Sequence, residues 1–456
     1  VGAGAAERCN GRDDDCDGAV DEGCPPGGVA LREAPTPLHF YPRDRDTGRC
    51  RVTFAGALEG AAAQVRVQAL RDGELLASEV SGAVDFTVNV PVDAGLHRYD
   101  FAVAWTDADG EFWRPAGEAT DVVCGDVFLI DGQSNAVATD YHGEDLGNAA
   151  RNPFVRSFGS GVRDASVRED TAFSVAVAYP ANSHGSVGQW GLHLANLLVQ
   201  AHGVPILLIN GAVGGTRVDQ HQRNDADPED ASTIYGRLLW RVRRAGVADQ
   251  VRGILWHQGE SDGGLAYDTY LARWTAMYDD WLADYPGVEG VFVFQVRAGC
   301  GNPTWNRNVA RDLPALLPRV LGSMSTTGVD GHDNCHFFHA VYVEWGERMA
   351  RLVRRALYGA EIAGNIDAPS PVSARWRAPN EVAIEFGATG GGLLPQPGAA
   401  AYFSLADGAQ VLDAQVEGTA VVLTTAAASQ AAWVTFADVP GDIPWLVNDL
   451  GIGAFA

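Results

Sequence analysis

The middle of the chain alternates between two hydrophobic patterns, and this alternation constrains the fold more than any other feature. Short apolar runs at 127–130, 205–209, 253–256 and 291–296 alternate with segments of helical spacing. One such segment, 266–285, places large apolar residues at i, i+3, i+4 and i+7, namely Tyr267, Tyr270, Leu271, Trp274, Tyr278 and Trp281. Strands that alternate with helices form a parallel sheet covered on both faces, so the pattern predicts an α/β domain with three α/β/α layers.

Segments with a β-strand pattern flank this region on both sides. Residues 29–120 contain short alternating runs, such as 64–68 and 86–90, separated by glycine and aspartate turns. Residues 361–456 repeat the pattern, most clearly at 381–386. Period-two alternation with frequent turns predicts β-sandwich-like domains. The 456 residues are too many for a single core, so several domains are expected.

The first 28 residues form a separate acidic unit that ends in a Pro-Pro-Gly-Gly linker. Closely spaced carboxylates repel one another without a cation, and Ca²⁺ prefers such oxygen ligands. The unit resembles the short Cys/Asp metal-binding repeats of secreted bacterial surface proteins, although Cys24 stands where an EF-hand carries its bidentate glutamate. A structural Ca²⁺ is therefore expected, with an acidic solvated tail as the alternative. The proposed ligands are Asp13, Asp15, Asp17, Asp21 and Glu22.

The seven cysteines fit an oxidising compartment. Cys50 and Cys124 bracket the first β-rich segment, and Cys300 follows a strand whose end should approach Cys335. We therefore expect disulfides that join 50 to 124 and 300 to 335, with buried free thiols as the alternative. The chain begins at Val1, which suggests a mature form whose signal peptide has been removed, and so a secreted or cell-surface protein.

The formal charge of −25 argues against nucleic acid and anionic membrane surfaces as partners, because the field of the whole chain repels phosphate. No apolar run approaches the length that crosses a bilayer, so no membrane span is expected. An uncharged polymer is the more favourable partner, because the negative field of the chain does not repel it. The sequence leaves the oligomeric state open.

A candidate nucleophile lies at the end of the first apolar run of the α/β region. The tetrad GQSN (132–135) follows 127–130, which reads as a strand that delivers Ser134 into a turn permitted by glycine. Far downstream, Asp333 and His336 precede a long helical pattern and offer the two groups that activate a serine. Ligands bind beyond the carboxyl ends of parallel strands, so these distant motifs should converge at one edge. A helix N-cap is the alternative role for Ser134.

Four blocks carry a resemblance to a known family. They are GDVFLIDGQSNAVA (125–138), LLINGAVGGTRVDQH (207–221), GILWHQGESD (253–262) and DNCHF (333–337). In order and separation they resemble the SGNH hydrolases, and within them the sialate O-acetylesterase-like group that includes the acetyl xylan esterases of carbohydrate esterase family six. The likeness covers about residues 121–360. It implies a secreted serine esterase that removes O-acetyl groups from carbohydrate through an acyl-enzyme.

The same resemblance implies roles for individual residues. Ser134 is then the nucleophile, His336 the general base and later acid, and Asp333 the group that orients His336. Three groups are expected to stabilise the oxyanion. They are the Ser134 amide, the backbone of Gly215, with Gly214 possible, and the side chain of Gln258, where most of the superfamily carries asparagine.

Other polar residues near these motifs receive lesser roles. Arg217 and Trp190 are candidate substrate contacts, with packing or surface roles as the alternative. Glu260 and Asp262 are expected to bond neighbouring backbone and position their loop rather than form a glycosidase pair.

Two other histidines and two other motif classes compete with this interpretation. His332 lacks the spacing to an upstream acid, and His339 falls in the helical segment, so His336 is favoured as the base. Ala136 breaks the G-x-S-x-G pattern of ordinary α/β-hydrolases. Phosphate-binding glycine motifs are absent where they would matter, and catalysis is expected to need no cofactor.

Two other functions remain open from the sequence. One is a broader short-chain carboxylesterase or lipase that acts on other small esters. The second is a non-catalytic glycan-binding surface protein, against which the intact Ser134, Asp333 and His336 count.

Overall fold

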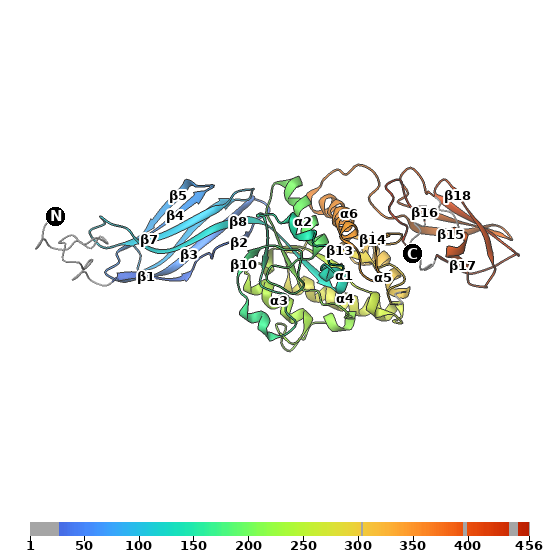
Figure 1. The fold of residues 1–456 in the computed structure, drawn as a ribbon, viewed down its shortest axis with the longest axis horizontal. Coiled ribbons are helices and arrows are strands. Elements are labelled where there is room, and N and C mark those ends of the chain that lie inside the picture. Colours follow the sequence, from blue (N-terminus) through green and yellow to red (C-terminus); the bar gives the residue numbers. More distant parts are fainter. Residues whose placement is uncertain (1–26, 302–303, 395–398, 437–445, 456) are drawn as a thin grey trace, which may run out of the picture. The chain divides into compact units, whose positions relative to one another are not determined.

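The computed structural model describes residues 27–301, 304–394, 399–436 and 446–455 (Figure 1). The acidic N-terminal unit lies outside these residues, so the Ca²⁺ site with Asp13, Asp15, Asp17, Asp21 and Glu22 stays a prediction. The chain divides into two compact units. One holds the residues up to Asp126 with Ala172–Val175 and Gly203–Leu207, and the other holds the remainder.

Antiparallel strands build the first unit. One sheet has the order β1-β3-β6, from Gly27–Glu33, Arg49–Gly60 and Asp85–Asp93. In a second group, β4 pairs with β5 and β7, and β7 pairs with β8; these strands are Gln64–Arg71, Glu74–Ser81, Tyr99–Thr106 and Arg114–Gly132. The short strands β2 (Phe40–Pro42) and β10 (Phe173–Val175) complete the unit. The predicted strands 64–68 and 86–90 are confirmed.

Alternate residues of these strands meet in one core. Along β6 every second side chain is buried, and Phe54 of β3 packs at 5.4 Å from the ring of Phe101 in β7. The predicted disulfide between Cys50 and Cys124 is confirmed, with a Cα–Cα distance of 5.9 Å. Both cysteines belong to this core, so the covalent bond lies inside the hydrophobic cluster that it stabilises.

A sheet with the order β9-β11-β8-β12-β13-β14 runs through the second unit, and β8, β12, β13 and β14 are parallel in it. Its further strands are Val155–Phe158, Ile206–Asn210, Val251–His257, Gly290–Gln295 and Val320–Ser325. β8 pairs in parallel with β12, β12 with β13, and β13 with β14. The four apolar runs of the sequence therefore form strands, and the predicted α/β class is confirmed. β8 continues through residue 120, where a domain boundary was expected.

Helices connect these strands (Figure 1). They are α1 (Ser134–Val137), α2 (Gln189–His202), α3 (Ile234–Arg244), α4 (Tyr267–Asp284), α5 (Thr304–Leu316) and α6 (His339–Tyr358). The predicted helix at 266–285 is α4, and it buries Tyr270, Trp274, Tyr278 and Trp281. Tyr267 and Leu271 of the predicted stripe are only half-buried. None of the described helices has the length and apolar character that a bilayer crossing requires.

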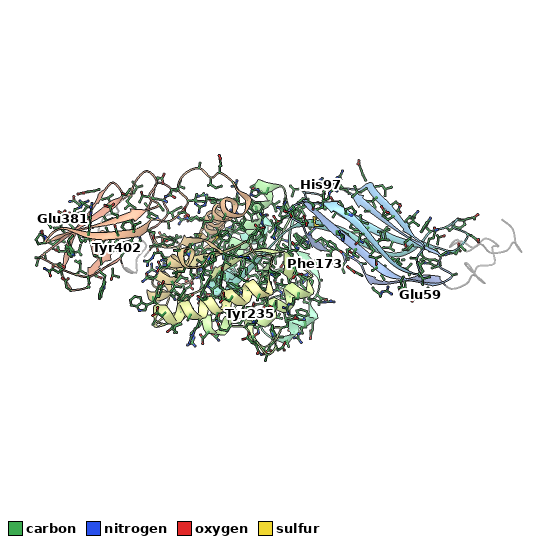
Figure 2. All side chains as sticks on the ribbon, turned by 180° about the vertical axis from the view of Figure 1, so that it is seen from behind. Glu59, His97, Phe173, Tyr235, Glu381 and Tyr402 are labelled. Atoms are coloured by element: carbon green, nitrogen blue, oxygen red, sulfur yellow. A yellow bond between two sulfur atoms is a disulfide. The ribbon has the colours of Figure 1, made fainter. Side chains whose placement is uncertain are left out.

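The last part of the chain is again rich in strands. β15, β16, β19 and β18 form a sheet in that order, and β17 pairs with β20. Their bounds are Ser370–Ala378, Glu381–Gly387, Ala420–Thr425, Val411–Glu417, Phe403–Leu405 and Val434–Phe436. Tyr402, labelled in Figure 2, packs with apolar residues of β16 and β19 in one cluster. The predicted strand at 381–386 lies within β16.

Candidate active site

Gly132 lies two residues before Ser134, and no other residue could replace it at this position. Gly132 ends β8 with a φ of +130°, and a Cβ there would lie 2.0 Å from the carbonyl oxygen of His257 in the neighbouring strand. Ser134 then opens α1, with Gln133 as N-cap. Within the described residues, no side chain caps the start of this helix. The strand-to-helix turn is thus confirmed, and the N-cap role for Ser134 is excluded.

The next residue, Asn135, ties this turn to two other motifs. Its side-chain Nδ2 donates to Glu260 Oε1 at 2.8 Å and to the carbonyl oxygen of Cys335 at 3.0 Å. Its Oδ1 accepts from the Tyr342 hydroxyl at 2.8 Å. Asn135 is buried, so these bonds are shielded from water. The convergence of distant motifs on the end of β8 is therefore confirmed for the first, third and fourth blocks.

Trp190 lies beneath the same turn. Its side chain is fully buried, and Nε1 donates to the carbonyl oxygen of Asn135 at 2.8 Å. A ring without exposed surface cannot stack on a sugar. The prediction that Trp190 contacts substrate is therefore wrong, and the ring instead supports the nucleophile turn from inside.

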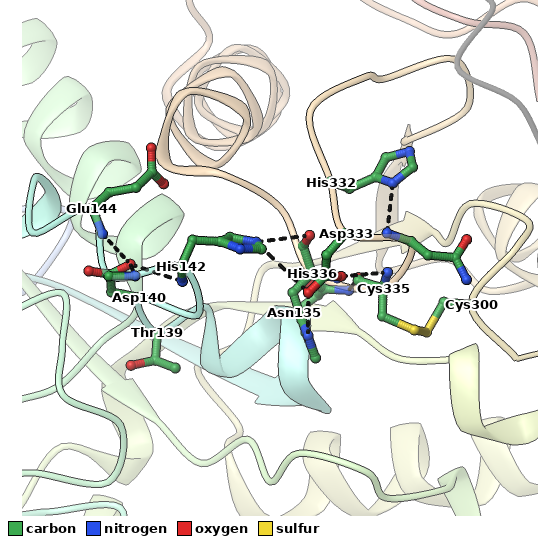
Figure 3. A network of polar contacts seen from close by, with 12 residues as sticks. Asn135, Thr139, Asp140, His142, Glu144, Cys300, His332, Asp333, Cys335 and His336 are labelled. Carbon is green, nitrogen blue, oxygen red and sulfur yellow. Dashed lines mark hydrogen bonds and ion pairs between the residues drawn. A yellow bond between two sulfur atoms is a disulfide. The ribbon is translucent and has the colours of Figure 1, made fainter.

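The loop with Asp333 and His336 is tightly folded (Figure 3). Asp333 Oδ1 accepts from the backbone N–H groups of Cys335 at 2.9 Å and His336 at 2.7 Å. The predicted disulfide between Cys300 and Cys335 is confirmed, with a Cα–Cα distance of 4.8 Å. Burial disfavours the charged form of Asp333, but these backbone bonds and the nearby imidazoles outweigh it and lower the pKa of the carboxyl.

The carboxylate of Asp333 faces two imidazoles. His336 Nδ1 lies 3.7 Å from Asp333 Oδ2, and His142 Nε2 lies 4.0 Å from the same oxygen. His142 Nε2 also contacts the carbonyl oxygen of His336 at 3.3 Å, and its ring stacks on Phe338. Asp333 and His336 are thus adjacent as predicted, whereas no motif in the sequence marked His142.

Tyr141 contacts both parts of the predicted machinery. Its ring lies parallel to that of His336, with centroids 3.9 Å apart, and its hydroxyl donates to the carbonyl oxygen of Ser134 at 2.7 Å. Burial raises the pKa of Tyr141, so the phenol remains a donor at neutral pH. Tyr141 therefore contacts both Ser134 and His336, two residues that are far apart in the sequence.

A single carboxylate folds the turn that presents Tyr141 and His142. Asp140 accepts from four successive backbone N–H groups, those of His142, Gly143, Glu144 and Asp145. Burial opposes the ionisation of Asp140, but these bonds outweigh it and lower the pKa of the carboxyl. An aspartate that starts a turn in this way is a local signal that could have located the segment, though not its role.

The glycine pair of the second block lies beside the nucleophile. A Cβ on Gly214 would lie 3.4 Å from Ser134 Cβ, and Gly215 adopts a φ of +76° that favours glycine. Among the described residues, the backbone N–H groups of Ser134, Gly214 and Gly215 have no hydrogen-bond acceptor. Unused donors beside a nucleophile are what an oxyanion requires.

The side chain of Gln258, the third predicted oxyanion donor, forms hydrogen bonds to other groups of the protein. Its Nε2 lies within hydrogen-bond distance of three acceptors: Gln133 Oε1 at 2.9 Å, the carbonyl oxygen of Thr216 at 2.6 Å and Asp262 Oδ2 at 2.8 Å. An amide nitrogen carries only two hydrogens, so none is left for a substrate in this arrangement. Gln258 as an oxyanion donor stays a prediction, and its contacts favour a positioning role.

The two acids that follow Gln258 do position their loop, as expected. Asp262 Oδ1 accepts from the backbone N–H of Val218 at 2.9 Å, and burial raises the pKa of this carboxyl. Glu260, however, bonds the side chain of Asn135 rather than backbone.

Three further candidates are occupied by other contacts. Arg217 forms two bonds to Asp219, at 2.9 and 2.6 Å, which neutralise its charge. His339 begins α6 and contacts Gln189, and His332 accepts from the backbone of Asn334. Among the described residues, no group of three or more metal-ligating side chains is arranged to hold an ion.

Comparisons with known proteins agree with this geometry. Residues 124–355, about half of the chain, match the family described as carbohydrate esterase, sialic acid-specific acetylesterase. The solved structure of a carbohydrate acetylesterase from Xanthomonas citri has a TM-score of 0.65 and 21% identity, covering 94% of this chain and 98% of that chain. A protein from Arabidopsis thaliana has a TM-score of 0.40 and 19% identity, covering 51% and 99%. No curated protein matches the sequence.

The dual contact of Tyr141 predicts two separable effects. Tyr141→Phe removes only the hydroxyl bond to Ser134, and we expect kcat on p-nitrophenyl acetate to fall by about tenfold, the value of one hydrogen bond. Tyr141→Leu also removes the ring beside His336 and should cost more. Both variants are compared by kcat and by thermal unfolding. Equal kcat values for the two variants would show that the stacked ring contributes nothing.

The three contacts of Gln258 predict that its loss affects stability. Gln258→Ala removes the two N–H donors that face Gln133, Thr216 and Asp262, and each buried acceptor left unsatisfied costs about 1–3 kcal/mol, so the melting temperature should fall together with kcat. The exposed Gln415→Ala serves as the matched control. A Gln258→Ala protein with the wild-type melting temperature and a kcat lower by about 10²–10³ would instead identify the amide as an oxyanion donor.

Proposed function

Since the chain belongs to the carbohydrate esterase family described as sialic acid-specific acetylesterases, we propose that it is a serine esterase that removes O-acetyl groups from carbohydrate. One observation carries the proposal. Tyr141 bonds the backbone of Ser134 and stacks on His336, so the proposed nucleophile and base lie around one side chain. A protein that only bound glycans would not need this arrangement.

The reaction follows the acyl-enzyme route. Ser134 Oγ attacks the acetyl carbonyl while His336 takes the hydroxyl proton, and the C–O bond to the sugar then breaks as His336 returns that proton to the leaving oxygen. Water, deprotonated by His336, attacks the acetyl-Ser134 ester, and acetate leaves as His336 returns that proton to Ser134 Oγ. Asp333 stabilises the imidazolium in both halves. Its oxygen lies 3.7 Å from His336 Nδ1, a separation that must shorten into a hydrogen bond when substrate binds.

The oxyanion is stabilised by backbone groups. We assign this role to the N–H of Ser134 and of the Gly214–Gly215 turn, whose lack of acceptors leaves them available. The buried bonds of Gln258 hold the same turn through Thr216. Fixed donors of this kind need no reorganisation when charge develops on the carbonyl oxygen.

We place the protein outside the cell. Two disulfides, Cys50–Cys124 and Cys300–Cys335, persist in oxidising compartments, and the second closes the loop that carries the proposed base. Catalysis uses only side chains and backbone of the chain, and a Ca²⁺ bound by the acidic N-terminal unit would be structural. No nucleic acid or membrane partner is proposed.

The proposed triad predicts non-additive losses. Ser134→Ala and His336→Ala should each lower kcat for acetate release by about 10⁴-fold, and the double variant should lose no more, because the groups act as one unit. The exposed His97→Ala, in the first unit, is the matched histidine control. Losses that multiply in the double variant would contradict a shared mechanism.

The substrate is tested by a direct comparison. Acetate release is measured from acetylated xylan, from O-acetylated sialic acid and from p-nitrophenyl acetate and butyrate, each with Ser134→Ala as the blank. We expect release from at least one acetylated sugar and a collapse of activity from acetyl to butyryl. Activity on butyrate but on neither sugar would indicate a general short-chain esterase.

A further inference from the structure

A buried imidazole that the proposed reaction does not use lies at the end of the second block. His221 ends the short helical turn Val218–His221, and its side chain is fully buried. Its Nδ1 lies 3.2 Å from Oδ1 of Asp131, a carboxylate that is also buried. Asp131 Oδ1 accepts from the backbone N–H of Gly132 at 2.8 Å. The imidazole is therefore joined to the end of β8, where the turn that presents Ser134 begins.

The second ring nitrogen faces the glycine turn. His221 Nε2 lies 2.9 Å from Oγ1 of Thr216, which follows Gly215. The Thr216 hydroxyl has one hydrogen, and it donates this hydrogen to the carbonyl oxygen of Val213 at 2.6 Å. Its oxygen must therefore accept from His221 Nε2. The hydroxyl thus joins the two residues that flank Gly214 and Gly215 and extends this link to His221.

This hydrogen-bond pattern assigns a hydrogen to both nitrogens of His221. Nδ1 faces a carboxylate and Nε2 faces a hydroxyl that already donates to a carbonyl, so each nitrogen has to be a donor. The ring is then an imidazolium paired with Asp131. Burial raises the pKa of Asp262, and the charge of His221 is among the interactions that oppose this rise. A buried ion pair that loses one partner leaves an uncompensated charge, so the surroundings must respond to the loss of either residue.

The glycine turn is also anchored at both of its ends. The N–H of Val213 donates to the carbonyl oxygen of Gly132 at 2.9 Å, and the carbonyl oxygen of Thr216 accepts from Gln258 Nε2 at 2.6 Å. Between these anchors, the two glycines contribute no side chain that could fix the backbone. The direction of their N–H groups therefore depends on the flanking residues. Of these anchors, the link from Thr216 to His221 is the one that leads to a buried ion pair.

We propose that His221 is a positioning residue: paired with Asp131, it holds Thr216 and thereby the two glycine N–H groups that stabilise the oxyanion. This inference rests on the proposed function and adds a group that controls the oxyanion donors from inside the protein. A fixed donor stabilises charge that develops only in the transition state, and a misplacement of about 1 Å can cost about 10²-fold in rate. His221 and Asp131 are buried and touch no substrate, so their loss should lower kcat and leave KM nearly unchanged.

The first test separates kcat from KM on p-nitrophenyl acetate. His221→Gln and Thr216→Val should each lower kcat by about 10- to 100-fold, with KM within about twofold of wild type. The double variant should lose no more than the more impaired single variant, because both changes break one chain of contacts. Thr216→Ser keeps the hydroxyl and should recover most of the kcat. Thr216→Val keeps the Asp131–His221 pair, so it tests the chain even where His221→Gln reduces the yield of folded protein.

A second measurement reports the oxyanion donors without turnover. Phenylboronic acid forms a tetrahedral, anionic adduct with a serine hydroxyl, which resembles the charged intermediate of the reaction. Its inhibition constant should rise about 10- to 100-fold in His221→Gln and Thr216→Val, in step with the loss of kcat/KM. Val353→Ala, which removes buried apolar atoms from α6, is the control for lost stability. It should lower the melting temperature and change neither kcat nor the inhibition constant.

Wild-type values of kcat and of boronate inhibition in His221→Gln and Thr216→Val would overturn the positioning role and leave the esterase intact. A loss of kcat without weaker boronate inhibition would overturn it as well. The same holds for losses that Val353→Ala reproduces at an equal fall in melting temperature, because they would reflect stability alone. A wild-type protein that hydrolyses neither p-nitrophenyl acetate nor an acetylated sugar, and that the boronate does not inhibit, would instead overturn the proposed function.

Discussion

The buried side chain of Asn135 is the contact on which the rest of the site depends. It donates to Glu260 and to the carbonyl oxygen of Cys335 and accepts from Tyr342, so the turn with Ser134 is joined to the loop with His336. A buried amide whose partners are removed carries a larger penalty than an exposed one, because no water replaces them. The link therefore fixes the relative position of two segments that the parallel sheet only brings near each other. Gly132 makes it possible, since any side chain there would collide with the carbonyl oxygen of His257 and displace the turn.

Strand positions and the proposed nucleophile could be predicted from the sequence, because both leave local signals. Apolar runs gave the strands of the parallel sheet, and a serine after such a run, preceded by glycine, marked the turn of Ser134. The disulfides could be predicted because each pair of cysteines brackets a segment that must fold back. Tyr141 and His142 could not be identified, since their contacts are made between loops that have no periodicity. Trp190 shows the opposite error, a predicted substrate contact that the structure does not place at the surface. Its side chain is fully buried, and a tryptophan near a motif looks the same in the sequence whether it is buried or exposed.

The contacts around Gln258 show why a resemblance does not by itself give geometry. The residue type at this position predicts a donor near the oxyanion, yet the amide nitrogen faces Gln133, Thr216 and Asp262. Gln133 precedes the nucleophile and Thr216 follows the glycine turn, whereas Asp262 belongs to the same loop as Gln258. An amide with these bonds determines where the backbone donors of Ser134 and Gly215 lie, and it can influence catalysis without touching the substrate. Distinguishing the two roles requires a measurement of stability as well as of rate.

Net charge and local charge predict different substrates, and distance decides between them. The formal charge of −25 repels acidic sugars from far away, but mobile ions screen this repulsion beyond about 8–10 Å at ordinary salt. At shorter range individual groups decide, and Arg217, which follows the glycine turn, is already neutralised by Asp219. The acidic surface therefore mainly slows the encounter with polyanions, which favours a short or uncharged sugar over a densely charged polymer.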